Sequence, residues 1–152
     1  MMNAKTLSIL AIVLWLAGAA TVAVMYVGGK TEQASDGRVA VILSEAERDF
    51  VLGEMRQMLA SVQGIVSAVA EEDMNSVEKI ALAIGSAEVR NVPKPLMLKL
   101  PRDFKIMGTD NHLEFDEVAA QAKHGGKAVL ERLGDLMVTC VACHESYSLK
   151  AE

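Results

Sequence analysis

Near its C-terminus the chain carries two cysteines and a histidine whose spacing suits one chemical task. The residues are Cys140, Cys143 and His144, in the order C-x-x-C-H. On a helix, the two cysteines share a face, so both thiols can reach the two vinyl groups of one porphyrin. His144 follows on that same face and can place an imidazole nitrogen on the iron. This spacing is the attachment signature of a c-type haem, and it predicts one covalently bound haem c.

Two other chemistries use similar residues. A zinc ion needs a fourth ligand and tetrahedral geometry, and Cys140, Cys143 and the adjacent His144 on one helix converge poorly on one metal. A thioredoxin-like C-x-x-C belongs near a βαβ pattern at the start of a helix, whereas this motif ends a chain with helical patterns. The haem interpretation is therefore favoured over both.

An uncharged segment near the N-terminus predicts a transmembrane helix. Residues 7–27 read LSILAIVLWLAGAATVAVMYV, 21 residues without a charge, between Lys5 and Lys30. About 20 apolar residues cross a bilayer core as a helix, whereas a secretory signal has an apolar region of roughly 7–15 residues. The length favours a retained anchor over residues 1–29, in contact with the lipid bilayer through residues 7–27. The small residues Ala17-Gly18-Ala19 offer a cleavage site, so a removed signal is the alternative.

Composition bounds what the remainder can do. The chain has 152 residues and a net charge of −5, which disfavours nucleic acid as a partner. Aromatic residues make up only 4% of it, so a small domain needs another source of buried apolar surface, which a porphyrin would provide. The sequence offers no Ser/His/Asp set, phosphate-binding glycine loop or paired carboxylates, and we do not expect an enzyme.

Helical patterns fill the first half of the segment after residue 43. Ser44 and Glu47 form a capping box, which predicts a helix over residues 45–70. Its apolar stripe falls at spacings of three and four: Val51, Met55, Met58, Val62, Ile65 and Val69. Asp73 is expected to cap a second helix that ends near Gly85. Residues 89–100 contain two prolines and are expected to form a loop.

Two further helices are expected in the second half. Residues 101–104 are expected to start at most a short turn, and Asp110 or Asn111 is expected to cap the third helix, which ends at Gly125-Gly126. Its inner face is predicted to hold Phe115, Val118, Ala119 and Ala122. The fourth helix runs from about Lys127 through the C-x-x-C-H motif. Its inward residues are predicted to be Val129, Leu130, Leu133, Leu136, Met137 and Cys140.

Together these patterns predict an all-α protein, an antiparallel four-helix bundle with an N-terminal transmembrane helix. No segment shows sustained alternation of period two, and short connections favour antiparallel neighbours. The domain organisation is an anchor over residues 1–29, a tether over residues 30–43 and one helical domain over residues 44–152.

The domain resembles the class II c-type cytochromes, the cytochrome c′ group. The resemblance covers about residues 44–152 and rests on the single C-x-x-C-H near the C-terminus, with the MRQML, LPRDF and CHESY segments. Class I cytochromes c carry the motif near the start of the domain. The chain departs from the family at Ser148, where a basic residue is common, and in its anchor, because the family is usually soluble.

The resemblance implies where the protein works. Lysine and arginine are nearly balanced on the two flanks of residues 7–27, so charge alone does not orient the helix. The haem of c-type cytochromes is attached outside the cytoplasmic membrane in bacteria. We therefore expect a single-pass protein of the bacterial cytoplasmic membrane, with the haem domain in the periplasm.

The sixth iron ligand is expected from the helix over residues 45–70. By its place before MLASV, Met55 matches the distal position of the family, and a thioether suits haem iron. Met58, one turn on, is the alternative, and both methionines could instead fill the core. His112 is a further candidate, although a capping or surface role suits it better, and His124 is expected at the surface. An open site is the remaining possibility.

The expected function is single-electron transfer to or from a membrane respiratory or oxidoreductase complex, as a subunit of that complex. The partner is that membrane redox complex or its electron donor or acceptor. The alternatives are a five-coordinate gas-binding protein like some members of the cytochrome c′ group, and an accessory subunit whose haem is mainly structural.

Overall fold

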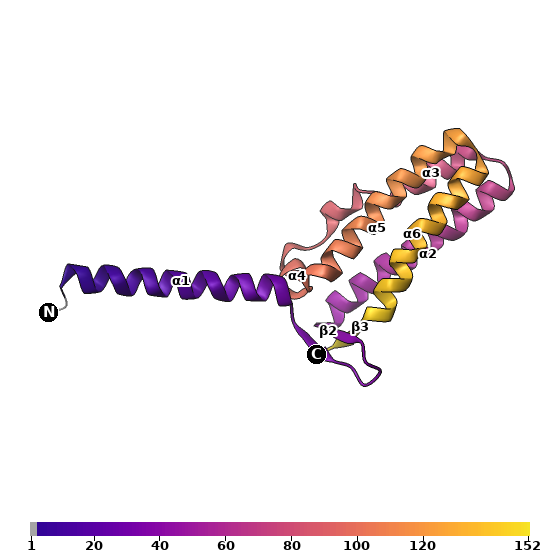
Figure 1. Ribbon diagram of the computed structural model, residues 1–152. Helices are drawn as coiled ribbons and strands as arrows, with labels where there is room; N and C mark the ends of the chain where they lie inside the picture. Colours follow the sequence, from indigo (N-terminus) through magenta and orange to yellow (C-terminus); the bar gives the residue numbers. More distant parts are fainter. Residues whose placement is uncertain (1–2) are drawn as a thin grey trace.

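A computed structural model describes residues 3–152, which form one long apolar helix joined to a mostly helical domain (Figure 1). The apolar helix, α1, spans Ala4–Gly28 and has a mean hydropathy of 2.4 over its most apolar window. At 1.5 Å per residue its 25 residues extend for ~37 Å, more than the ~30 Å of a bilayer core. None of that window is buried by the rest of the chain. The predicted helix is confirmed as one long and apolar enough to cross a membrane.

The first two helices of the domain lie where the sequence predicted them. Helix α2 spans Glu45–Ala70, and its capping box is present: the Ser44 hydroxyl accepts from the Glu47 amide, and the Glu47 carboxylate accepts from the Ser44 amide. Helix α3 spans Met74–Ile84, capped by the Asp73 carboxylate, which accepts from the Ser76 amide. Both starts are fixed by local hydrogen bonds, which a sequence pattern can reveal.

The expected loop over residues 89–100 was wrong. A 3₁₀ turn, η1, occupies Glu88–Asn91, and a short helix, α4, spans Lys94–Lys99. Pro95 lies in the first turn of α4, where a helix does not use the amide hydrogen that proline lacks. Leu96 and Leu100 of this segment are buried, so tertiary packing orders residues that look irregular in the sequence.

The third predicted helix begins much earlier than expected. Helix α5 spans Arg102–Gln121, so Asp110 and Asn111 lie in its interior and cap nothing. Its first turns are held by burial of Phe104 and Lys105. A 3₁₀ turn, η2, covers Ala122–His124, and Gly125, with a φ of 90°, provides the predicted break before helix α6, Gly126–Ser146.

Helices α2, α3, α5 and α6 enclose one apolar core. Its largest fully buried members come from all four helices: Ile65, Val77, Phe115, Val118, Val129 and Leu136. Two residues of α6 that were predicted to face inward, Leu130 and Met137, are instead 45% and 46% exposed. The apolar stripe of α6 is therefore wider than the surface that the neighbouring helices cover.

The structure also contains a small sheet that the all-α prediction lacked. Its strands are β1 (Thr31–Gln33), β2 (Val39–Leu43) and β3 (Tyr147–Ala151), in the order β1-β2-β3. Strands β1 and β2 are antiparallel, whereas β2 and β3 are parallel, with Val39 opposite Tyr147. Residues 30–43 are thus not an irregular tether: Val41 and Leu43 are fully buried, in a second apolar cluster that also contains Phe104 and Cys143.

The end of α1 is packed firmly against α4 and α5. The Lys30 amide donates to the Lys99 carbonyl at 2.7 Å. The Lys105 ammonium donates to the Tyr26 carbonyl at 2.6 Å and lies 3.7 Å from the centre of the Tyr26 ring. Gly29 has a φ of 65°, and a Cβ there would lie 2.5 Å from the Lys99 carbonyl oxygen, so only glycine fits this contact.

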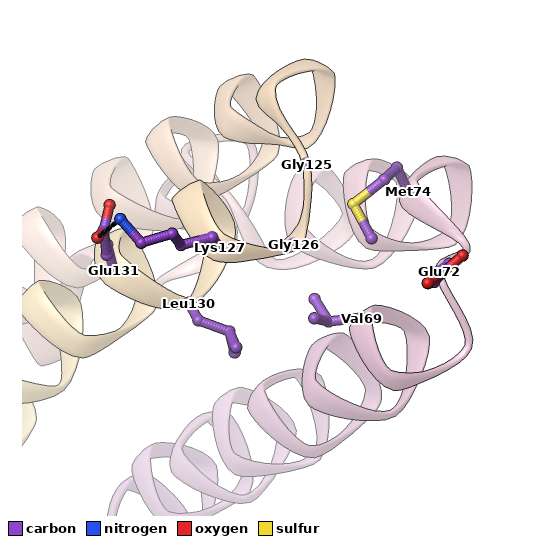
Figure 2. Close-up of a pocket in the computed structure, with 8 residues that line it drawn as sticks. All are labelled: Val69, Glu72, Met74, Gly125, Gly126, Lys127, Leu130 and Glu131. Carbon is purple, nitrogen blue, oxygen red and sulfur yellow. Dashed lines mark ion pairs between the residues drawn. The ribbon is translucent and has the colours of Figure 1, made fainter.

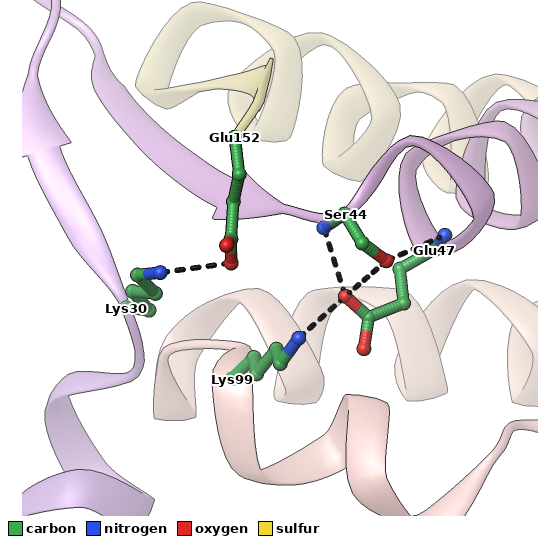
Figure 3. A network of polar contacts seen from close by, with 5 residues as sticks. All are labelled: Lys30, Ser44, Glu47, Lys99 and Glu152. Atoms are coloured by element: carbon green, nitrogen blue, oxygen red, sulfur yellow. Dashed lines mark hydrogen bonds and ion pairs between the residues drawn. The ribbon is translucent and has the colours of Figure 1, made fainter.

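A polar network ties the start of α2 to the same region (Figure 3). The Glu47 carboxylate accepts from the Lys99 ammonium at 2.7 Å as well as from Ser44, and Lys30 pairs with Glu152 at 2.8 Å. The hydrogen bond from Lys99, then that from the Ser44 amide, lowers the pKa of Glu47 from 4.5 to about 2. The ionised carboxylate is therefore the form that the fold stabilises.

This network predicts a specific acid sensitivity. The pKa of Glu47 is lower in the folded than in the unfolded chain, so the ionised carboxylate stabilises the folded protein. This stabilisation is fully present above pH 4.5 and is lost as the pH falls toward about 2. Glu47→Gln should lower the free energy of unfolding at neutral pH and flatten its decrease over that acidic interval. Thermal unfolding of the purified protein against pH measures both effects. Glu45→Gln, an exposed carboxylate in the same first turn, is the matched control, and equal pH profiles for the two variants would contradict the assignment.

Candidate functional site

A groove between α2 and α6 brings all four predicted site residues together. Met55 lines it from α2, and Cys140, Cys143 and His144 line it from α6. The groove has a volume of about 370 Å³, within the range of small-molecule sites in proteins. Its other walls are mostly apolar: Leu52, Met58, Leu59, Val62, Phe115 and Met137. The arrangement therefore combines two thiols, an imidazole and a thioether with apolar surface.

The two cysteines are free thiols on one face of the last turns of α6. Cys143 is 8% exposed and Cys140 is half-buried. Burial raises the pKa of both thiols, and the neighbouring Cys140 raises that of Cys143 further. Both side chains are thus protonated at neutral pH. The Cys140 thiol donates to the Asn111 side-chain carbonyl of α5, with sulfur and oxygen 3.8 Å apart, a contact that orients it.

His144 lies in the last turn of α6, with its side chain exposed to the groove and to solvent. Its carbonyl accepts from the Arg38 guanidinium at 3.2 Å, as does the Tyr147 carbonyl. Arg38 lies in the turn between β1 and β2 and also pairs with Asp36 at 2.7 Å. The β1–β2 hairpin therefore covers the carbonyl end of α6 and holds the backbone that carries His144.

Two methionines line the α2 side of the groove. Met55 also borders an adjoining hollow of about 380 Å³ that His144 and Arg48 share. Met58 lines the groove too, and on its other side borders a cavity of about 100 Å³. Both side chains are half-buried. A thioether is thus available at either position, and Met55 is the one that shares two hollows with His144.

His112 does not have the capping or surface role that the sequence suggested. Its side chain is 6% exposed, and Nδ1 lies 2.7 Å from the Ile84 carbonyl oxygen at the end of α3. Because a carbonyl only accepts, Nδ1 carries the proton. The ring lines the 100 Å³ cavity rather than the groove. His124, by contrast, is exposed, as expected.

Several side chains that line the groove were not assigned to it from the sequence. Arg56 of α2 lines the groove and forms no ion pair with any residue of 3–152. Asn111 of α5 contacts Cys140. Met137 lies one turn of α6 before the C-x-x-C-H motif. Asn111 precedes the predicted inward Phe115 by four residues, so a helix predicted from residue 102 would have placed it on the same face. Met137 was expected in the core.

The zinc alternative gains no support from the geometry. Within residues 3–152, no group of three or more histidine, cysteine, aspartate or glutamate side chains is arranged to hold a metal ion.

Comparisons with known proteins add no relative. No family model matches the chain, and no similar curated protein or solved structure was found.

Proposed function

We propose that the protein is a membrane-anchored c-type cytochrome with one haem, similar to the class II group, that transfers single electrons. The observation that carries this proposal is the groove, which gathers Cys140, Cys143, His144 and Met55 from two helices. The C-x-x-C-H spacing supplies the attachment chemistry, and the groove supplies space and apolar walls beside it.

The residues of the groove fit the demands of a haem. Its apolar walls suit the porphyrin, and Arg56 at the groove provides a cation for a propionate carboxylate. When bound, the haem supplies one-electron oxidation and reduction of its iron. The rest of the chemistry belongs to the protein.

Each protein group has a separate task in this proposal. The thiols of Cys140 and Cys143 would hold the haem through two thioethers, because addition of each S–H bond across a vinyl group requires no oxidant. The His144 imidazole would bind the iron through a ring nitrogen, and Arg38 holds the His144 backbone. The Met55 thioether would bind the iron as well, which would favour its ferrous form and electron transfer.

We infer that α2, α3, α5 and α6 form an antiparallel four-helix bundle. They share one apolar core, and the α2–α3 and α5–α6 connections are short, which supports this arrangement. The groove lies between the first and last of these helices, where a cofactor site in a bundle is expected.

We further infer that α1 anchors the domain to the bacterial cytoplasmic membrane, with the haem domain in the periplasm. The length and hydropathy of α1 support a single crossing. An anchored carrier needs its electron donor or acceptor in the same membrane, so the proposed partner is a membrane respiratory or oxidoreductase complex.

Optical spectra of the reduced protein test the proposed function. With Met55 bound to the iron, carbon monoxide should change the spectrum slowly or not at all. Immediate and complete binding would instead favour a gas-binding protein, an alternative supported by the cavity beside Met58. A protein that carries no haem after expression with a haem-attachment system would contradict both.

The anchor makes a separate prediction. We expect the full-length protein to stay with the membrane fraction after a high-salt wash, because a spanning helix is held by apolar burial rather than by charge. Replacement of residues 1–29 by a cleavable signal should give a soluble haem-bearing domain. That domain should unfold at a lower temperature, since Lys105 loses the Tyr26 carbonyl. Release by salt of a protein that has been shortened by this segment would mean that the segment is a cleaved signal.

A further inference from the structure

The short helix α4 exposes a face that nothing in the domain covers. Lys94, Pro95 and Leu98 are exposed, and Leu98 has 51% of its surface accessible. Leu96 and Leu100 on the other side are 1% and 5% exposed. The helix is therefore amphipathic, with an outward face made of one large apolar side chain and one cation.

The position of this face is fixed relative to the end of α1. The last residue of α4 accepts a hydrogen bond from Lys30, two residues after α1 ends, and Lys105 joins Tyr26 of α1 to the Met97 carbonyl of α4 at 3.2 Å. Figure 1 shows α4 beside the end of α1, whereas α3 extends to the far end of the domain. If α1 crosses the bilayer, α4 begins where the acyl chains end.

The chemistry of the face matches that boundary. The headgroup layer on each side of the hydrocarbon core is roughly 5–7 Å deep, which is comparable with the ~9 Å length of a six-residue helix. Tyr26 is 50% exposed at the same level, and tyrosine is typical of membrane interfaces. Lys94 has no ion-pair partner within residues 3–152, whereas Lys99 pairs with Glu47 and Lys30 with Glu152. Lys94 is thus an unpaired cation on this face and is available to an external anion.

We propose that the outer face of α4 is a lipid-binding surface that lies in the headgroup layer of the membrane. Leu98 enters the boundary of the acyl chains, and the Lys94 ammonium contacts lipid phosphates. The inference rests on the proposed anchoring by α1. Together with the packed end of α1, it gives the domain a second membrane contact, which holds the groove in a defined orientation.

Depth-dependent quenching of tryptophan fluorescence tests this contact in the full-length protein. Trp15 is the only tryptophan, so Trp15→Phe provides a background without one. In this background, Leu98→Trp should show blue-shifted emission and lose intensity in vesicles of phosphatidylcholine and phosphatidylglycerol brominated near the top of the acyl chains. Leu82→Trp is the matched control, because Leu82 of α3 is 49% exposed but lies on the far part of the domain. The control should keep its intensity.

The outcomes separate this proposal from the anchoring on which it rests. Co-flotation with vesicles and unquenched emission from both variants would overturn the α4 contact while leaving the anchor intact. Failure to float with vesicles would overturn the anchor and the contact together. Equal quenching of the Leu98→Trp variant with Lys94 in place and after Lys94→Glu would overturn the role of Lys94.

Discussion

Replacing Cys140 and Cys143 together by alanine should leave a polypeptide that shows no haem staining after denaturing electrophoresis. The two thiols are the only cysteines of the chain and both line the groove, so no other residue can form a thioether to the haem. The double variant should also be less stable than the haem-bearing protein, since the apolar walls of the groove would be left facing water.

The control for this experiment lies between the two cysteines. Val141→Ala changes a residue that is 54% exposed and leaves both thiols and His144 in place, so haem staining should be unchanged. Covalent haem on the double cysteine variant would disprove the proposed attachment. Loss of haem from the Val141→Ala variant would show that the assay reports on folding rather than on thioether formation.

Met55→Ala is the second change with a large expected effect. Loss of the distal thioether should convert a low-spin spectrum to a high-spin one and open the iron to carbon monoxide. It should also lower the reduction potential, because a thioether favours ferrous iron and axial ligands set potentials over about 0.8 V across haem proteins. Optical spectroscopy and a redox titration measure these effects.

Met58→Ala is the natural comparison, because both methionines lie on the α2 side of the groove and both are half-buried. This change should leave the spin state unchanged. It should lower the free energy of unfolding by less than the ~2–5 kcal/mol that is lost when a fully buried methionine is replaced by alanine. A spin change in Met58→Ala but not in Met55→Ala would show that Met58, one turn further along α2, is the iron ligand. A wild-type protein that is already high-spin would favour the gas-binding alternative.

What the sequence predicted well was set by local interactions. The start of α2 follows from the Ser44–Glu47 capping box, and the break before α6 follows from a glycine with positive φ. These two features need only the spacing of residues within one element. The groove shared by Cys140, Cys143 and Met55 is a contact between helices, and Met55 was assigned to it from the family resemblance.

The failures all involve partners that are distant in the sequence. Helix α4 and the start of α5 are ordered by burial of Leu96, Phe104 and Lys105, the last against the end of α1. Residues 39–43 became a strand because the chain terminus pairs with them. His112 is buried because the end of α3 offers it a carbonyl. No periodicity within one segment encodes such contacts.

The parallel pairing of β2 with β3 has a consequence for how the protein matures. Strand β2 leaves the ribosome early, whereas β3 is made of five residues at the very end of the described chain. The sheet therefore cannot close until the helices between the two strands have been made, and a chain that lacks β3 leaves Val41 and Leu43 without the strand that pairs with β2. Because β3 follows the C-x-x-C-H helix directly, its docking would come after the motif has emerged. The β2–β3 pairing therefore forms late, after every residue that lines the groove has been made.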